Sequence, residues 1–350
     1  MKKETMKLKK ILAILLSVCM LLALAACGSS SSDTASSDNA NSAQYDKVEL
    51  KLSCNGTDQG NDTRGAQKFK ELIEEQSGGA ITVQIYNNDQ LASGNMSKGL
   101  ELLLDGTVDI DIHSTSIIAN LDSSLMVSTL PWIFSDYQAA EDAFFGTGGD
   151  YIASVLEGKG VTYLGALHNG FKLMTNNKVL IKSPEDLNGL KMRIPGGDFF
   201  AAFYSAYGAS PQAMSWSEVF SALQQGTIDG QDNSISTCVS NNIQEVQKYF
   251  TISRHTYEAF TWMANTANFE KLSASTQELI RSCVEQACKE TNQEIVSEED
   301  ELIQKCKDAG CEFYELTDAD IESFRAVIAD LIEEYKAKYG EEACKAFNVQ

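Results

Sequence analysis

The residue of this chain that most clearly suggests chemistry is an arginine inside an otherwise apolar segment. Arg193 lies between Met192 and Ile194, in a short segment that the pattern predicts to be a strand. A buried guanidinium is costly without a partner, and its parallel N–H donors match the two oxygens of a carboxylate. The partner is therefore either an acid of the chain itself, in a structural ion pair, or a bound anion.

The chain carries none of the short motifs that indicate common catalytic or cofactor chemistry. GxSxG, HExxH, GxxxxGK[ST] and GxGxxG are all absent. The cysteines form no CxxC pair and the three histidines are scattered, so no zinc motif emerges. We therefore predict no catalytic residue, no metal site and no cofactor. A hydrolase would need a paired nucleophile and base, which the sequence does not show.

The N-terminus has the pattern of an export signal. Five lysines lie within the first ten residues, an apolar stretch covers residues 11–26, and small residues precede a cysteine. The apolar stretch is shorter than the roughly 20 residues that a membrane-spanning helix needs. The run Leu24-Ala25-Ala26-Cys27 resembles a bacterial lipobox, which implies a signal peptide over 1–26 and a lipid on Cys27. The alternative is an ordinary secretory signal with an incidental cysteine.

A polar, serine-rich segment follows the cysteine. Residues 27–45 are mostly Ser, Asp, Asn, Ala and Gly, and cannot bury enough surface to offset the entropy of ordering. We predict a disordered linker that holds the folded part away from the membrane.

Charge and length restrict the class of protein. The net charge is −21, and removal of the signal with its five lysines and one glutamate makes it about −25. This balance argues against binding to nucleic acid or to an anionic lipid surface. The remaining chain is too long for one comfortable core, which favours two lobes. Seven cysteines remain outside the signal and lipobox, and we expect them to be mainly free and partly buried.

Strands and helices alternate along the chain, which predicts a mostly parallel sheet covered by helices. The expected strands are 48–53, 81–86, 108–112, 163–167, 171–175, 191–194, 227–229, 249–253, 257–264 and 311–315, and the expected helices are 66–75, 97–104, 198–207, 218–225, 275–307 and 318–338. The helix over 275–307 would span roughly 50 Å, longer than one lobe is wide. It is therefore expected to brace both lobes.

One block in the middle of the chain resembles a known family. Residues 186–195 (DLNGLKMRIP) and 208–233 (GASPQAMSWSEVFSALQQGTIDGQDN) strongly resemble the solute-binding proteins of TRAP transporters, the DctP-type receptors for C4-dicarboxylates and sialic acid. The segments 78–91, 105–110 and 130–134 extend the resemblance over most of the chain. It implies an α/β, two-lobe, periplasmic-binding-protein-like fold with a cleft, hinge strands and a long bracing helix. The implied lobes are 46–167 plus about 253–290, and 168–252 plus about 291–350.

The resemblance also implies a set of ligand-binding residues. Arg193 matches the arginine that grips the carboxylate of the ligand, and Lys172 falls where many members carry a second arginine. Lysine keeps the charge but lacks the bidentate fork. Trp216 matches an aromatic residue over the ligand, and Asn233 a ligand-binding asparagine. Lys172 could instead be a surface residue, and Trp216 a core residue.

Three further positions are weaker candidates. His255 is placed like a histidine that lines or borders the cleft, although a structural role fits equally well. Asn55 and Ser114 follow strand ends, where ligands of open α/β sheets gather. Their alternative role is to cap turns.

The resemblance implies an extracytoplasmic receptor that binds a small organic acid and delivers it to TRAP membrane subunits. A lipid on Cys27 would hold the receptor at the outer face of the cytoplasmic membrane or in the periplasm. The receptor would not be an enzyme. The alternatives are a substrate-binding lipoprotein of an ATP-driven importer, a sensor subunit that presents the ligand and, less strongly indicated, a secreted hydrolase.

Overall fold

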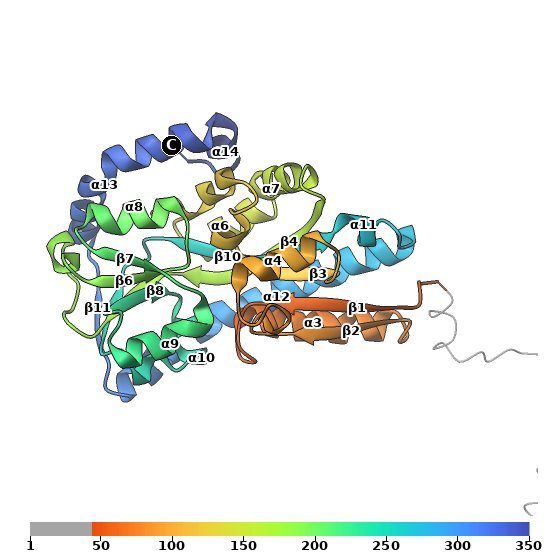
Figure 1. Cartoon of the computed structure of the whole chain (residues 1–350), viewed down its shortest axis with the longest axis horizontal. Helices are drawn as coiled ribbons and strands as arrows, with labels where there is room; N and C mark the ends of the chain where they lie inside the picture. The colour runs from red at the N-terminus through yellow and green to blue at the C-terminus, as the bar shows by residue number, and fades with distance from the viewer. Residues whose placement is uncertain (1–43, 350) are drawn as a thin grey trace, which may run out of the picture. The chain divides into compact units, whose positions relative to one another are not determined.

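The computed structural model describes residues 44–349, which form two β-sheets with helices packed on them (Figure 1). The predicted signal peptide, the lipidation of Cys27 and nearly all of the predicted linker lie outside the described residues. No helix within residues 44–349 is long and apolar enough to cross a membrane.

The first sheet has the strand order β2-β1-β3-β10-β4. Its strands are Ile81–Tyr86 (β2), Val48–Cys54 (β1), Ile110–Ser114 (β3), Tyr257–Asn265 (β10) and Val161–Phe171 (β4). Strands β2, β1 and β3 run parallel, whereas β10 runs antiparallel to both β3 and β4. In β1, Leu50 and Leu52 are buried and alternate with the exposed Glu49 and Lys51, as the sequence predicts, whereas the end of the strand is buried on both faces.

The second sheet has the strand order β11-β9-β5-β8-β6-β7. Its strands are Glu312–Glu315 (β11), Tyr249–Ile252 (β9), Leu173–Asn176 (β5), Gly230–Asn233 (β8), Lys191–Ile194 (β6) and Ser210–Ala213 (β7). Strand β5 runs antiparallel to β8 and β9, and the other pairs are parallel. Each sheet therefore contains one antiparallel strand, and the α/β class is confirmed.

The chain crosses between the sheets at two short joints that lie side by side. Lys172 alone separates β4 from β5, and residues 253–256 separate β9 from β10. The backbone N–H of Lys172 donates to the carbonyl of Thr256 at 2.8 Å, which ties the two joints together. A charged side chain is thus placed where both sheets meet.

Short helices and 3₁₀ turns cover the two sheets. They are α3 (Asn61–Gln76), η1 (Gln90–Ala92), α4 (Met96–Leu104), α5 (Thr115–Ile118), η2 (Ser123–Thr129), α6 (Tyr137–Phe144), α7 (Thr147–Glu157), η3 (Pro184–Leu187), α8 (Asp198–Ala206), α9 (Trp216–Gln225), α10 (Ile235–Ser240), η4 (Ile243–Glu245) and α11 (Thr266–Phe269). Side-chain caps fix several of their starts. Asn95 accepts from the backbone of Lys98 at the start of α4, and Asp136 accepts from Ala139 at the start of α6.

Helix α12 (Ala274–Asp308) is capped by Ser273 and contains neither proline nor glycine. Its first half buries Ile280, Val284 and Cys288 in the core of the first sheet. Near its end, Cys306 is buried in a core formed by the second sheet. The helix therefore braces both sheets, as its length predicts.

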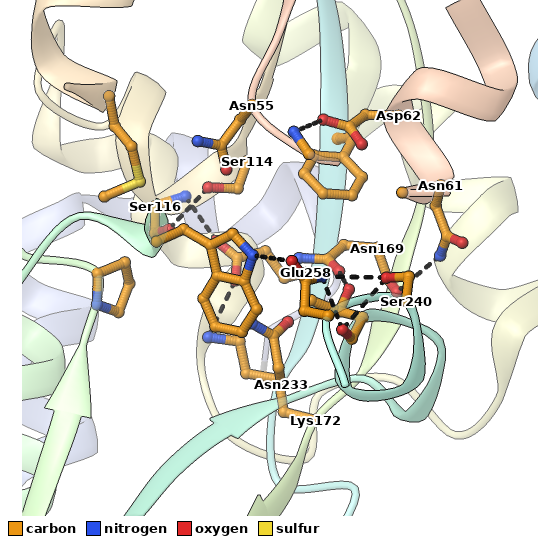
Figure 2. A pocket seen from close by; sticks show the side chains of 18 of the residues that line it. Asn55, Asn61, Asp62, Ser114, Ser116, Asn169, Lys172, Asn233, Ser240 and Glu258 are labelled. Atoms are coloured by element: carbon orange, nitrogen blue, oxygen red, sulfur yellow. Dashed lines mark hydrogen bonds and ion pairs between the residues drawn. The ribbon is translucent and has the colours of Figure 1, made fainter. Parts of the chain in front are cut away.

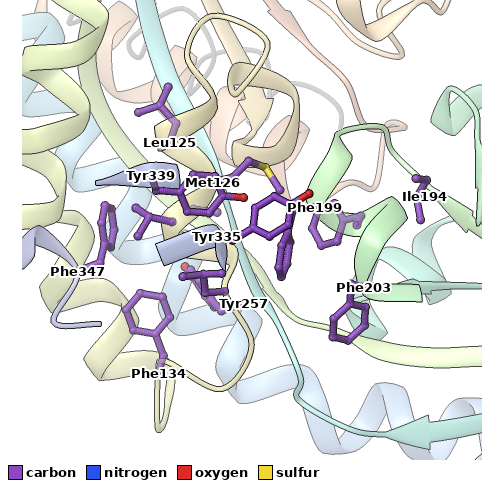
Figure 3. Close-up of a cluster of buried hydrophobic side chains, with 14 of the residues drawn as sticks. Leu125, Met126, Phe134, Ile194, Phe199, Phe203, Tyr257, Tyr335, Tyr339 and Phe347 are labelled. Atoms are coloured by element: carbon purple, nitrogen blue, oxygen red, sulfur yellow. The ribbon is translucent and has the colours of Figure 1, made fainter. Parts of the chain in front are cut away.

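The largest apolar core is closed by the two last helices, α13 (Asp318–Tyr339) and α14 (Glu341–Ala346) (Figure 3). Tyr335 of α13 packs edge-on against Phe199 of α8 at 5.0 Å between ring centres. Phe347, after α14, packs against Phe144 of α6 at 5.4 Å. Phe134 packs against Tyr257 of β10 at 5.4 Å, so the segment 130–134 lies against the first sheet. One core thus contacts elements of both sheets.

Most predicted elements are present, with shifted ends. The strand expected at 227–229 is wrong, because Gly226 ends α9 in the left-handed conformation and the chain turns before β8 begins at Gly230. The sequence did not predict the helices α5, α6, α7, α10, α11 and α14 or the strand β7. All seven cysteines of the described chain are free, as expected, and all are buried, more completely than expected. The exact limits of the two lobes stay predictions.

Candidate functional site

A cavity between the two sheets collects side chains from strand ends and from the crossing joint (Figure 2). It holds about 480 Å³ not filled by protein atoms, including its opening to solvent. Six of the seven predicted site residues line it: Asn55, Ser114, Lys172, Arg193, Trp216 and Asn233. The seventh, His255, does not.

Arg193 reaches the cavity from the end of β6 and is 3% exposed. Its Nε and Nη2 atoms donate to the carbonyl oxygen of Met214 at 3.2 and 3.0 Å, which fixes one edge of the guanidinium. No group of residues 44–349 accepts a hydrogen bond from Nη1, and none of their carboxylates forms an ion pair with Arg193. The outer edge of the guanidinium is therefore available for a bidentate contact.

Burial lowers the pKa of Arg193 to about 10, although Asp232 and Glu258 favour its charged form from a distance. The group is still protonated at neutral pH. An internal ion pair, the alternative that the sequence left open, is therefore not formed within the described chain. Arg193 is a buried cation with one unoccupied edge.

Lys172 is paired with two acids. Its Nζ atom lies 2.9 Å from Oε2 of Glu258 and 3.5 Å from Oδ1 of Asp232, and 4.5 Å from the ring centre of Phe200. Burial alone would lower the pKa of Lys172, but the two acids raise it above its ordinary value. At 2% exposure Lys172 is not a surface residue. Figure 2 shows Lys172 and Asn233 below Glu258, on the same side of the cavity.

His255 lies behind the cavity wall. Its Nε2 atom is 3.1 Å from Oδ2 of Asp232, its Nδ1 atom is 2.7 Å from the hydroxyl of Ser253, and its ring stacks on Phe203. The Tyr204 hydroxyl donates to the same Asp232 oxygen at 2.7 Å. The structure therefore places His255 as a partner of Asp232, in keeping with the structural role that the sequence left open.

These four residues form one network, which we call the Lys172 cluster: Lys172, Asp232, Glu258 and His255. Burial alone would raise the pKa of Asp232, but Lys172 and His255 hold it well below its ordinary value. The backbone N–H of Ser116 donates to Oε1 of Glu258 at 3.0 Å. Each carboxylate oxygen of this cluster thus has a partner.

Trp216 covers Arg193 from the start of α9. The centre of the Trp216 ring lies 5.3 Å from Cζ of Arg193, and the indole N–H donates to Oδ1 of Asn241 at 3.0 Å. Trp216 is 9% exposed; it lines the cavity and also packs into the core of the second sheet, whereas its contact with a ligand stays a prediction. Asn233, at the end of β8, presents its amide to the same cavity.

The first sheet contributes mainly uncharged polar groups. Asn55 follows β1, and Ser114 ends β3. Asn61, at the start of α3, donates to the hydroxyl of Ser236 in α10 at 2.9 Å and so links the two sides of the cavity. Asp62 also lines the cavity and accepts from the backbone N–H of Gly56 at 2.6 Å.

A second group of buried charges lies beside this wall, and we call it the His113 cluster: Asp62, Asp89, Asp111 and His113. All four are at most 1% exposed. Burial raises the pKa of Asp62 and of Asp111 to about 6. Burial opposes the charged form of His113, but Asp111 and Asp89 nonetheless raise its pKa to about 9. Asn55 connects this cluster to the cavity, since its amide donates to Oδ2 of Asp89 at 2.5 Å.

The sequence did not single out Glu258, Asp62, Asn61 or Asn169, which also line the cavity. Glu258 was hidden in a predicted strand. A charged residue inside the apolar segment 257–264 is the same signal that identified Arg193, and it could have been used here. The other three gave no comparable signal.

Two α/β sheets joined by crossing strands, with a cavity between them that contains a buried arginine without an acidic partner in residues 44–349, are typical of two-lobe solute-binding proteins. Residues 54–338 match the family of bacterial extracellular solute-binding proteins, family 7, and the chain belongs to this family. The resemblance to TRAP solute-binding proteins is thereby confirmed.

Relatives and solved structures of this family are similar to the chain over most of its length. The chain is 35% identical over 285 residues to the C4-dicarboxylate-binding periplasmic protein DctP of Rhodobacter capsulatus, covering 81% of this chain and 85% of the relative. A TRAP periplasmic solute-binding protein of Shewanella oneidensis with bound succinate has a TM-score of 0.81 at 30% identity, covering 86% and 98% of the two chains. The sugar acid binding protein DctPAm of Advenella mimigardefordensis, in complex with galactonate, has a TM-score of 0.83 at 25% identity, covering 87% and 98%.

Proposed function

We propose that this protein captures a small organic acid anion in the cavity between its sheets and delivers it to TRAP membrane subunits. The observation that carries the proposal is the unoccupied outer edge of Arg193, a buried cation without an ion-pair partner in residues 44–349. A carboxylate offers two oxygens in the geometry that this edge requires. The relatives that bind succinate and galactonate support the same class of ligand.

The remaining lining residues suit the other end of such a ligand. Amides at Asn55, Asn169 and Asn233 can both donate and accept hydrogen bonds, and the hydroxyl of Ser114 does the same. These groups match hydroxyl or carbonyl oxygens. The ring of Trp216 offers an apolar face that excludes water from the contact with Arg193.

Isothermal titration calorimetry against a panel of organic acids tests the proposal. The panel contains dicarboxylates, sugar acids and other monocarboxylates, each with a neutral alcohol or amide analogue. We expect at least one acid to bind, and its neutral analogue to bind at least 30-fold more weakly. Equal binding of an acid and its neutral analogue, or no binding by any acid, would overturn the proposal.

We further propose that a lipid on Cys27 holds the receptor at the outer face of the cytoplasmic membrane or in the periplasm. The lipobox-like run that ends at Cys27 and the serine-rich segment after it support this. Expression of the full chain and of Cys27→Ser, followed by membrane fractionation, tests the anchor. We expect the unsubstituted chain in the membrane fraction and the variant in the soluble exported fraction; the same distribution for both would contradict the anchor.

A further inference from the structure

Glu258 is an acid in the wall of a cavity that is otherwise arranged to receive an anion. It is 3% exposed, lies on β10 opposite Gly170 of β4, and reaches Lys172 at 2.9 Å. Its second carboxylate oxygen accepts the backbone N–H of Ser116 at 3.0 Å. Glu258 is therefore held in place by the joint between the sheets and by the segment that follows β3, and it is paired with the cation that a second carboxylate of a ligand would need.

The two cations of the wall differ in whether they have an ion-pair partner. Lys172 is paired with Glu258 and Asp232, whereas Arg193 has no ion-pair partner among the described residues. One ligand carboxylate on Arg193 completes this arrangement. A second carboxylate would have to displace Glu258 from Lys172 and leave a buried acid without its cation, which is strongly unfavourable.

We propose that Glu258 is a specificity-determining residue, which makes the site selective for acids with one carboxylate and a hydroxyl group at the far end, against dicarboxylates of the same carbon skeleton. The inference rests on the proposed function and narrows it. A terminal hydroxyl can donate to Glu258 or to Asp62 without displacing Lys172. A terminal carboxylate can donate to neither, and it is repelled by both.

Ligand pairs that differ only at the terminal carbon separate these two cases. D-erythronate and meso-tartrate form a four-carbon pair, and D-galactonate and galactarate form a six-carbon pair; in each, a CH₂OH group is replaced by a carboxylate. Calorimetry at pH 7.5 gives the ratio of the two affinities within a pair. We expect the hydroxylated monoacid to bind at least tenfold more tightly in the pair that the cavity accommodates.

The variant Glu258→Gln tests whether this residue causes the preference. The amide keeps the shape and can still accept from Ser116, but it releases Lys172 for the ligand. We expect the preference for the monoacid to fall at least tenfold or to reverse. Glu258→Asp keeps the charge and should retain the preference. Glu312→Gln is the matched control, because Glu312 is an exposed acid on β11 paired with Lys248, and its loss changes the net charge equally.

The outcomes distinguish this inference from the proposed function. If no acid of any pair binds, the proposed function is overturned and this inference with it. If acids bind and the dicarboxylate binds as tightly as its partner, the inference alone is overturned, and the unsubstituted protein suffices to show this even if a variant fails to fold. If the preference exists but is the same in Glu258→Gln and Glu312→Gln, Glu258 does not determine it.

Discussion

The two buried charge clusters beside the cavity differ in how completely their members are paired. In the Lys172 cluster, Oδ1 of Asp232 meets Lys172, Oδ2 meets His255 and Tyr204, and both oxygens of Glu258 have partners. In the His113 cluster, both oxygens of Asp111 and both ring nitrogens of His113 lack a hydrogen-bond partner within the described chain. Nε2 of His113 lies 3.2 Å from Asp89, at ion-pair distance but without good hydrogen-bond geometry.

This difference indicates what each cluster can contribute. A fully paired network holds its members in one arrangement, so the Lys172 cluster can fix the geometry in which Arg193 meets a ligand. The His113 cluster contains three acids and one histidine, so its energy depends on which of them carry protons. We therefore expect ligand specificity from the first cluster and sensitivity to pH from the second.

Removal of the central cation gives the largest expected effect. Lys172→Met leaves Asp232 and Glu258 buried without Lys172, and we expect a loss of about 3–5 kcal/mol in the free energy of unfolding. Urea denaturation measures it. The control is Lys248→Met, which breaks an exposed pair with Glu312 and should cost at most about 1 kcal/mol. Equal losses in both variants would show that pairing in the Lys172 cluster does not stabilise the fold.

The second prediction concerns the cation that has no acidic partner in the described chain. Arg193→Ala removes the proposed carboxylate contact, and loss of such a buried partner typically costs about 2–5 kcal/mol. We expect affinity for the acid ligand to fall by roughly 30-fold to several thousand-fold, since about 1.4 kcal/mol is tenfold. Calorimetry measures this, with the exposed Arg281→Ala as control. Unchanged affinity in Arg193→Ala would contradict the assignment of the anion site.

The third prediction tests whether the His113 cluster makes the free energy of unfolding depend on pH. The pKa of His113 is raised to about 9, so the folded state binds its proton more tightly than the unfolded state does. The resulting stability is present below the unfolded pKa of about 6.5 and is lost as the pH rises through about 9. Between pH 6.5 and 8, we expect the free energy of unfolding to fall by roughly 1.5 kcal/mol, because the slope approaches its limit of about 1.4 kcal/mol per pH unit only once the unfolded histidine has lost its proton.

Above pH 8 the buried thiols also contribute, because burial raises the pKa of cysteines such as Cys238 and Cys306. The measurement therefore stops at pH 8. His113→Gln should abolish most of the slope. His168→Gln should not flatten the slope and should steepen it only slightly, since burial lowers the pKa of folded His168 to about 3 and only the unfolded state binds its proton near pH 6.5. A slope that is unchanged in His113→Gln would show that His113 does not carry the pH dependence of the cluster, whose acids Asp62 and Asp111 titrate near pH 6.

Much of the fold could be predicted because its signals are local. The alternating pattern of β1, the short apolar strand β6 and the long helix α12 can be identified without knowledge of their neighbours. The placement of β8 failed because Gly226 and the turn after it shift the strand by a few residues. No local signal places β10 between β3 and β4, since that pairing joins segments about 90 residues or more apart.

The site could be predicted where one residue differs in polarity from its neighbours in the sequence, as Arg193 does in an apolar strand. The position of Glu258 beside Lys172 follows from the pairing of β10 with β4, which places Glu258 opposite Gly170. The orientation of His255 depends on the joint between β9 and β10 and on Asp232, neither of which a residue pattern specifies. The position of Arg193 in an apolar strand and the family resemblance therefore indicated which residues could bind an anion, and non-local pairing decided which of them face the cavity.

The smallest expected effect tests whether Trp216 serves the site or only the core. Trp216→Phe keeps an aromatic face near Arg193 but removes the indole N–H that donates to Asn241. The lost hydrogen bond no longer holds the ring over Arg193, and if the about 1 kcal/mol that it contributes is needed to keep the ring there in the complex, we expect affinity to fall by at most roughly fivefold, as measured by calorimetry. The control is Trp262→Phe in the core of the first sheet, where the ring packs on Phe69 and is fully buried. Because Trp262 lies outside the cavity lining, its substitution should lower the melting temperature without changing affinity. If both substitutions lower only the melting temperature, Trp216 is a core residue, and the paired geometry of the Lys172 cluster acts on the ligand without an aromatic cover.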